Sequence, residues 1–266
     1  MTDTSRHHFE NIVQELTSSG SSRTWSILVT IFGDLAQNPN DKISGPLLSS
    51  LTQLIGIKPQ AMRVALHRLR YDGWIITEKS GRTSKHRLSE YGLIQSVIAS
   101  PKIYARTATP PESWRIIITN PDASVDEKTL VIRGYRKILS GVYIGDRTVL
   151  LDTSDFLTLE GDLLSIPEWL QSAIADEASV GEYSRLIGML VTVERALNDG
   201  YAPTITETAV LRTLIVHDWR RIVLRQPDLS LEFLQKNPSA QCRKTVWELL
   251  ERLERPPLEA LEMVAT

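Results

Sequence analysis

The chain has 266 residues, with 30 basic and 32 acidic side chains and a formal net charge of −2. Apolar residues make up 42% and charged residues 23%, which is typical of a folded globular protein and excludes disorder as the main state. The single cysteine, Cys242, excludes an intramolecular disulfide and any zinc site built from several cysteines. No apolar run approaches the roughly 20 residues that span a bilayer, and residues 1–15 lack the apolar core of a secretion signal. We therefore expect a cytoplasmic protein of two or three domains.

Basic residues are concentrated in one stretch. From Lys58 to Arg87 eight residues are basic and two are acidic, so the rest of the chain is acidic. A local positive block is the electrostatic footprint of a surface that meets phosphate groups. Charge alone fits an ordinary solvated surface equally well, so the predicted elements have to separate these two interpretations.

Three helices are predicted in the first third of the chain. Apolar residues at helical spacing predict a helix over Trp25–Leu35 and another over Ser44–Leu54. Gly56 follows at the position where a helix commonly ends in a left-handed residue. A third helix is predicted over Pro59–Tyr71, because proline is well tolerated at the first position of a helix.

The third predicted helix has two distinct faces. Apolar residues at intervals of three and four must face a core, and these are Met62, Ala65, Leu66 and Leu69. The other face carries Gln60, Arg63, Val64, His67 and Tyr71, with Arg68 and Arg70 at its sides. Two helices joined by a tight glycine turn, the second exposing Arg and Gln, predict a helix-turn-helix whose second helix enters the major groove. There Arg pairs with guanine and Gln with adenine.

A basic hairpin is predicted directly after this helix. Trp74–Glu78 is rich in strand formers, Ser80 and Gly81 supply a turn, and Lys85–Leu88 returns. A basic hairpin in this place is the wing of a winged helix, and Ser89 caps a fourth helix after it. We expect Gln60, Arg63 and His67 to read base edges, and Arg68, Arg82, Lys85 and His86 to hold phosphates or the minor groove; Val64 lies on the same face. The alternative is a helical module that binds protein through this surface.

Several segments of this first half also resemble one family. They are Thr30–Asp34, Gly56–Ile57, Met62–Leu69, Asp72–Ile75 and Gly81–Ser89, followed by Pro110–Pro111 and Trp114–Arg115. In this order they resemble the phenylacetate-degradation repressors, the PaaX-like regulators. The resemblance implies an α+β protein with an N-terminal winged helix-turn-helix, a central ferredoxin-like domain and a helical C-terminal domain. It also implies a homodimeric repressor of an aromatic-acid catabolic operon. Such a repressor is released from palindromic operator DNA by an aryl-CoA thioester such as phenylacetyl-CoA.

The remaining chain is predicted to be mixed and then helical. A strand over Arg115–Thr119, a helix over Val125–Leu139 and a strand over Val142–Ile144 suit a small α+β domain, with further strands at Thr148–Asp152 and Leu163–Ile166. The later helices are predicted at Glu168–Glu177, Gly181–Asn198, Thr204–Leu224 and Ser239–Glu254. The expected domains are residues 1–100, a linker over 101–112, residues 113–166, and a dimerisation or effector domain over 167–266.

An effector that is an acyl-CoA needs cations for its phosphates and an apolar slot for its acyl group. Two clusters offer such residues. The first is Arg133, Tyr135, Arg136 and Tyr143, and the second is Trp219, Arg220 and Arg221. The alternative is that these cations pair with the many acidic residues of this half.

The sequence contains no motif for catalysis or metal binding. There is no glycine-rich nucleotide loop, and Cys242 has no neighbouring histidine that would activate it. His7 and His8 lie in a segment expected to be a loose tail. We therefore expect no enzyme activity, no cofactor and no metal. The alternative is a DNA-targeted, metal-dependent nuclease or hydrolase that uses acids such as Asp122, Asp126 and Asp146.

Overall fold

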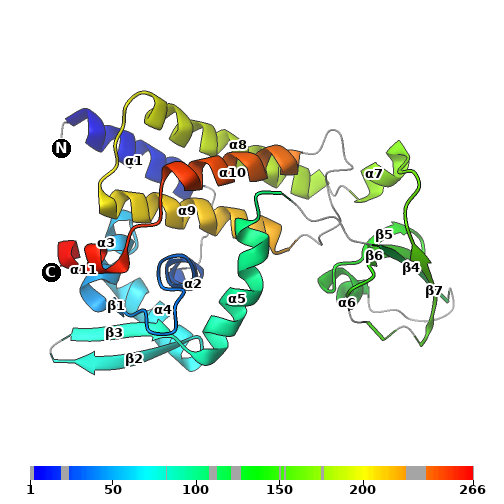
Figure 1. Cartoon of the computed structure of the whole chain (residues 1–266), viewed down its shortest axis with the longest axis horizontal. Helices are drawn as coiled ribbons and strands as arrows, with labels where there is room; N and C mark the ends of the chain where they lie inside the picture. The colour runs from blue at the N-terminus through cyan, green and yellow to red at the C-terminus, as the bar shows by residue number, and fades with distance from the viewer. Residues whose placement is uncertain are drawn as a thin grey trace. The chain divides into compact units, whose positions relative to one another are not determined.

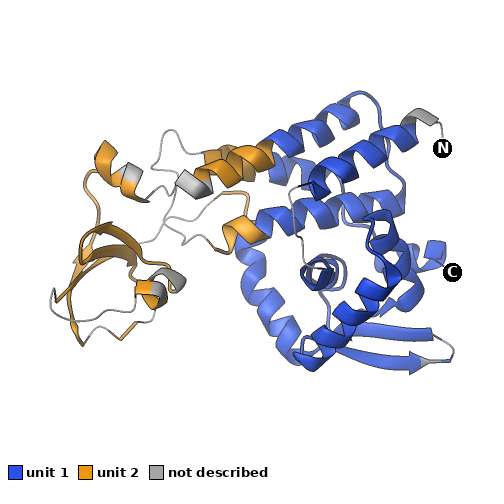
Figure 2. Cartoon of the chain, turned by 180° about the vertical axis from the view of Figure 1, so that it is seen from behind, with its two compact units in different colours: residues 1–104, 188–220, 245–266 blue, residues 105–187, 221–244 orange. Residues whose placement is uncertain are grey.

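The computed structural model describes residues 3–18, 24–81, 83–107, 113–120, 127–149, 151–152, 154–174, 177–225 and 238–265. N-terminal helices with a small sheet come first, then a central antiparallel sheet, then C-terminal helices (Figure 1), which confirms the predicted α+β class. The chain divides into two compact units (Figure 2). Unit 1 comprises residues 1–104, 188–220 and 245–266, and unit 2 comprises residues 105–187 and 221–244.

In the N-terminal part of unit 1, the described residues form five helices and three strands. These are α1 (Asp3–Thr17), α2 (Thr24–Leu35), β1 (Ile43–Ser44), α3 (Gly45–Leu54), α4 (Pro59–Tyr71), β2 (Ile75–Ser80), β3 (Thr83–Leu88) and α5 (Glu90–Tyr104). The strands form an antiparallel sheet in the order β1-β3-β2. The predicted helices and hairpin of this region are confirmed, and the third helix begins and ends at the predicted residues.

Local interactions set the ends of these elements. The Ser44 hydroxyl accepts a hydrogen bond from the Leu47 amide and so caps the start of α3. Gly56 has a φ of 84°, and the Ile57 amide donates to the Thr52 carbonyl, which closes the end of α3. At the start of α5 the Ser89 hydroxyl accepts from the Gly92 amide, as predicted. These caps fix the turn from α3 into α4 and the exit from the hairpin.

The first helix, α1, was not predicted. Phe9, Ile12, Val13 and Leu16 are buried at intervals of three and four residues, and the His8 ring stacks on Tyr201 at 5.8 Å. The expectation of a loose tail is therefore wrong. The polar residues that suggested a tail lie on the exposed side of an amphipathic helix, whose narrow apolar stripe is buried against the rest of unit 1.

Unit 2 contains the central sheet. The elements that lie wholly within unit 2 are β4 (Trp114–Thr119), α6 (Glu127–Ile132), β5 (Arg136–Leu139), β6 (Val142–Asp146), β7 (Phe156–Gly161) and α7 (Glu168–Ile174). The sheet is antiparallel throughout, in the order β5-β6-β4-β7. On one face Ile117 packs with Leu130, Tyr135 and Tyr143, and on the other Trp114 and Ile144 pack with Leu170 of α7.

Two predictions for unit 2 were wrong. The predicted helix over Val125–Leu139 stops at Ile132, because Gly134 takes a φ of 92° and the chain then enters strand β5. The fourth strand is β7, and the described residues of Thr148–Asp152 and Leu163–Ile166 are not strands. At the first of these, the Asp146 carboxylate accepts from the amide and hydroxyl of Thr148 and so holds a turn.

The described part of the C-terminal third is mainly helical, as predicted. Its helices are α8 (Glu177–Asn198), α9 (Ile205–Val223), α10 (Pro238–Arg252) and α11 (Leu258–Ala265), of which α11 was not predicted. Helices α8, α9 and α10 each contribute residues to both units. The parts of these helices in unit 1 therefore join the N-terminal elements in one fold. Within the described ranges, none of the helices has the length and apolar composition needed to cross a membrane.

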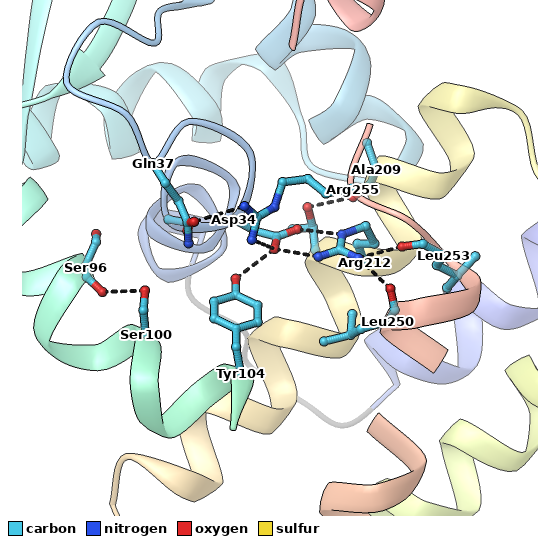
Figure 3. A network of polar contacts seen from close by, with 12 residues as sticks. Asp34, Gln37, Ser96, Ser100, Tyr104, Ala209, Arg212, Leu250, Leu253 and Arg255 are labelled. Carbon is cyan, nitrogen blue, oxygen red and sulfur yellow. Dashed lines mark hydrogen bonds and ion pairs between the residues drawn. The ribbon is translucent and has the colours of Figure 1, made fainter. Parts of the chain in front are cut away.

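A buried ion pair joins these late helices to α2 (Figure 3). The carboxylate of Asp34 accepts hydrogen bonds from Nε and Nη2 of Arg212 in α9, both at 3.0 Å, and from the Tyr104 hydroxyl at 2.7 Å. Nη1 of Arg212 donates to the carbonyls of Leu250 and Leu253. Burial, followed by the charge of Asp34, raises the pKa of Tyr104. Helices α2, α5, α9 and α10 thus share one polar cluster in the interior of unit 1.

Candidate nucleic-acid interface

Only one side of helix α4 packs against the rest of unit 1. Met62, Ala65, Leu66 and Leu69 are buried, as the sequence predicted, and α4 packs against α2, α3 and β2. Pro59 stands at its first turn, and the Trp74 amide donates to the Leu69 carbonyl beyond its end. The opposite side of α4 faces solvent along its whole length.

The exposed side of α4 has an ordered pattern of side chains. Successive residues on a helix are turned by about 100°, so the buried residues fix where every other side chain points. Opposite the buried side lies a row that we name the central strip, formed by Gln60, Val64, His67 and Tyr71. Arg63 and Arg70 lie on one side of this strip and Arg68 lies on the other. An uncharged or weakly basic row is therefore bordered by cations on both sides.

Most cations of this region are free to meet an anion. Five of them are exposed and have no ion-pair partner among the described residues: Lys58, Arg63, Arg70, Lys79 and Lys85. Arg68 is held in place, because its guanidinium lies 5.4 Å from the centre of the Trp25 ring and its Nε lies 3.4 Å from the Asp72 carboxylate. This ion pair is exposed and contributes little to stability, so the Arg68 side chain can still leave Asp72 and contact another anion.

The β2–β3 hairpin adds a second positive surface. Residues opposite each other across the two strands share a face, and the pairs Glu78–Lys85 and Ile76–Arg87 place these four on one side. Nζ of Lys42 lies 2.6 Å and Nε of Arg87 3.0 Å from the Glu78 carboxylate. Their hydrogen bonds, that of Lys42 first, lower the pKa of Glu78. The single acid of this face is thereby neutralised, and Lys85 is left exposed and positive.

His86 lies on the other face of the hairpin. The residue is 6% exposed, and Nδ1 of its ring lies 2.8 Å from the Thr77 hydroxyl. Burial, and then the charge of Arg70, lowers the pKa of His86, so the ring is neutral at pH 7. The structure therefore places Lys85 and His86 on opposite sides of β3. Arg82, the other predicted residue of the hairpin, lies outside the described residues.

The structure brings most of the predicted DNA-binding residues to one exposed surface. Gln60, Arg63, Val64, His67 and Arg68 share the outer side of α4. Sequence reasoning left three exposed cations out of this set, namely Lys58, Arg70 and Lys79. Helical spacing could have identified Arg70, because a residue seven positions after Arg63 lies on the same side of a helix.

The first predicted effector cluster belongs to unit 2. Tyr135 and Tyr143 are buried in the sheet core, and the Tyr135 hydroxyl accepts from Nη1 of Arg115 at 3.1 Å. Arg133 is exposed and Arg136 is half-buried. The two cations border this part of the sheet, and their role in effector binding stays a prediction.

The second predicted effector cluster lies on α9. Nε1 of Trp219 donates to the Ile103 carbonyl at 2.8 Å, and the ring is buried. The Arg220 guanidinium donates to the Thr30 hydroxyl at 2.7 Å and to the Ser26 carbonyl at 2.8 Å. These two side chains therefore attach α9 to α5 and α2 inside unit 1. Arg221 is half-buried and belongs to unit 2, so its role as an effector residue stays a prediction.

Of the three acids considered for a nuclease, Asp146 is the one that the structure describes. Asp122 and Asp126 lie outside the described residues, and Asp146 accepts hydrogen bonds from Thr148. No group of three or more potential metal ligands is found among the residues that the structure describes. Cys242 is buried, which raises its pKa to about 12, so its thiol stays protonated and unreactive.

The chain is similar to known proteins. A relative, the transcriptional repressor PaaX of Escherichia coli (strain K12), is 25% identical over 232 residues, which are 79% of this chain and 73% of the relative. A solved structure, the uncharacterized protein Rv0674 from Mycobacterium tuberculosis, is similar with a TM-score of 0.57 and 18% identity, and the match covers 92% of this chain and 99% of that chain. This second likeness shows a shared fold.

Two family models match the chain itself. Residues 23–92 match the model described as PaaX-like protein, and this segment contains α2 to the start of α5. Residues 175–262 match the model described as PaaX-like protein C-terminal domain, which covers the late helices. Together the two segments make up more than half of the 266 residues, so the chain belongs to the PaaX-like family.

Proposed function

We propose that the protein is a DNA-binding transcriptional regulator that uses α4 to read the major groove. The observation that carries this proposal is the exposed side of α4, where the central strip is bordered by the exposed cations Arg63 and Arg70 on one side and Arg68 on the other. A helix of this kind fits the major groove, because phosphates line both edges of the groove and base edges form its floor. The distant relative named as a transcriptional repressor supports the same function.

The local architecture supports a winged helix-turn-helix. Helices α3 and α4 are joined by the Gly56 turn, and the basic hairpin follows as the wing. In unit 2 the order β5-β6-β4-β7 is the strand order of a ferredoxin-like sheet. Along the chain, α6 lies between β4 and β5. We propose these two folds as the DNA-binding and central parts of the regulator.

The finer function follows the family resemblance. We propose a homodimeric repressor that binds a palindromic operator and controls an aromatic-acid catabolic operon. An aryl-CoA thioester such as phenylacetyl-CoA is the proposed effector, with Arg133 and Arg136 as candidates for its phosphates. Family membership favours a regulator over the nuclease or hydrolase alternative.

Binding to the DNA upstream of the protein's own gene tests the proposed function. Fluorescence anisotropy compares this fragment with a shuffled fragment of the same composition, over a series of salt concentrations. We expect tighter binding to the upstream fragment and a steep loss of affinity with salt, because phosphate contacts release counterions. Equal, weak and salt-insensitive binding to both fragments would favour the protein-interaction module.

The same assay separates repressor from nuclease. Incubation of the upstream fragment with the protein and Mg²⁺ or Mn²⁺ should leave the DNA intact, whereas a nuclease cleaves it. Addition of phenylacetyl-CoA should release the bound DNA if the effector class is right. Binding that no aryl-CoA thioester weakens would keep the regulator and remove the proposed effector.

A further inference from the structure

Val64 is an apolar side chain in the middle of the surface that we propose to meet DNA. It is 64% exposed, although the neighbouring apolar residues of α4 are buried. It stands in the central strip, one turn after Gln60 and one turn before His67. Valine is also a weaker helix former than alanine or a long polar residue, so neither packing nor helix propensity explains it there.

The surroundings of Val64 indicate what it would face. Arg63 and Arg70 lie on one side of the central strip and Arg68 on the other. In the proposed complex these cations lie toward the two phosphate rows that border the major groove. The central strip then faces the groove floor, where only base edges are present. This step rests on the proposed function.

The groove floor offers one type of apolar group. Guanine, adenine and cytosine present hydrogen-bond donors and acceptors there, and thymine alone adds a C5-methyl group. A valine cannot satisfy a donor or an acceptor, so it would desolvate any other base edge at a cost. Gln60, one turn earlier, has the amide that pairs with adenine. Adenine in turn brings the methyl group of its thymine partner into the same groove.

We propose that Val64 is a specificity-determining residue that recognises thymine through its C5-methyl group. Gln60 and Val64 together favour A·T pairs at the centre of each half-site. Burying one methyl group changes an affinity by about fourfold. A dimer with two half-sites squares that factor, so the loss of every methyl group should weaken binding by roughly tenfold or more.

Thymine-free DNA tests this proposal without knowledge of the operator. The fragment upstream of the gene is amplified with dUTP in place of dTTP, which removes every thymine methyl group and keeps every base pair. Wild type, Val64→Ala and Val97→Ala are titrated against the thymine and uracil fragments. Val97 is the matched control, since it is a valine on helix α5 with 62% exposure. Circular dichroism verifies that all three proteins are folded.

The proposal expects a specific pattern of affinities. Wild type and Val97→Ala should bind the uracil fragment more weakly than the thymine fragment, by the same factor. Val64→Ala should bind the thymine fragment about as weakly as wild type binds the uracil fragment. It should also no longer distinguish the two fragments. Uracil interference footprinting on the wild type should then locate the contacted thymines.

Two results would overturn the methyl contact while keeping the proposed function. In one, wild type binds its upstream DNA specifically but has equal affinity for both fragments. In the other, Val64→Ala shows the same uracil effect as wild type, which would assign the effect to DNA shape. No specific binding of wild type to the thymine fragment would overturn the proposed function and this inference with it.

Discussion

The carboxylate of Asp34 is fully buried, and its charge is balanced by Arg212, which is itself almost fully buried. Such a pair loses its hydration on folding and recovers the loss only through good geometry and further hydrogen bonds. Here the carboxylate accepts from Arg212 and Tyr104, and Arg212 also donates to two carbonyls (Figure 3). Both charges of the pair are therefore satisfied. Removal of Asp34 would leave the buried Arg212 guanidinium without its carboxylate, and removal of Arg212 would leave the buried Asp34 with only Arg255, at 3.5 Å.

Arg212→Met should lower the free energy of unfolding of unit 1 by up to about 3–5 kcal/mol. It removes the buried cation of Asp34 and leaves only the half-exposed Arg255, whose Nη2 lies 3.5 Å from the Asp34 carboxylate. Urea denaturation followed by tryptophan fluorescence measures the change. The matched control is Arg195→Met, since Arg195 is an exposed arginine of α8. A loss below about 1 kcal/mol for Arg212→Met would contradict the buried charge pair.

His86 gives the protein a pH-dependent stability that the sequence did not predict. Its folded-state pKa is lowered by burial and by Arg70, so the unfolded chain takes up a proton at a higher pH than the folded one. The resulting stability is present above the unfolded pKa of about 6.5 and is lost as the pH falls toward the folded pKa. Urea midpoints of the wild type should therefore drop between pH 7.5 and pH 5.

His86→Gln should reduce that drop, because glutamine keeps a polar partner for Thr77 and does not titrate. Other groups also titrate in this range, so the informative quantity is the difference between variant and wild type at each pH. His67→Gln is the matched control, since it makes the same substitution at an exposed histidine. The same drop in His86→Gln and wild type would disprove the role of His86.

At the scale of elements, the sequence was informative where a pattern is local. The third helix was predicted to the residue, because Pro59, the Gly73 stop and one apolar stripe all agree. The strand β5 was missed, because Arg136–Leu139 continues the helical spacing and only its pairing with β6 makes it a strand. Helix α11 was missed because its eight residues are held by distant partners, such as the Ser44 amide that donates to Glu262.

In the candidate site too, local patterns were predicted from the sequence and contacts between distant residues were not. The outer residues of α4 followed from helical spacing, because the buried stripe fixes the exposed side. The burial of His86 could not be predicted from the sequence. Alternation along β3 shows that Lys85 and His86 point to opposite faces, but it does not show which face is buried. Trp219 and Arg220 were assigned to an effector by composition, whereas their partners Ile103 and Ser26 lie more than a hundred residues away.

We expect different effects from substituting two arginines that lie on the same side of helix α4. Recognition helices contact bases mainly through their N-terminal residues, so Arg63 should reach a base edge. Arg63→Ala should cost about 1–3 kcal/mol of binding and relax specificity at one base pair. Arg70, two turns later, should contact the backbone, and Arg70→Ala should weaken all sequences alike. Binding to a set of single-base variants of the upstream site measures both, and an unchanged base preference in Arg63→Ala would refute its assignment.

We expect Lys85 in the hairpin to contribute to DNA binding through its charge alone. Glu78 is already neutralised by Lys42 and Arg87, so Lys85 has an uncompensated charge on that face. Lys85→Ala should weaken specific and non-specific DNA equally and reduce the slope of log affinity against log salt by about one. Arg195→Ala on α8 is the control. A loss confined to one DNA sequence would instead give Lys85 a base contact.

At the scale of the whole molecule, the sequence of the chain interleaves the two units. Helices α8, α9 and α10 each supply residues to both, and α9 carries Arg212 and Arg220, which bind α2 in unit 1. A change in unit 2 that shifts one of these helices would act on elements that hold α2 and, through it, α4. We hypothesise that effector binding works as such a population shift, favouring a state that binds DNA less well.

Linkage makes this hypothesis quantitative. If phenylacetyl-CoA lowers the affinity for upstream DNA by some factor, the DNA must lower the affinity for the thioester by the same factor. Isothermal titration of the thioester into free and DNA-bound protein measures the second factor, and anisotropy measures the first. Arg133→Ala with Arg136→Ala in unit 2 should abolish thioester binding and keep DNA binding, whereas Arg63→Ala should weaken DNA binding and keep thioester binding. If Arg63→Ala also lost the thioester, the two ligands would share the surface of α4, and competition would replace the population shift.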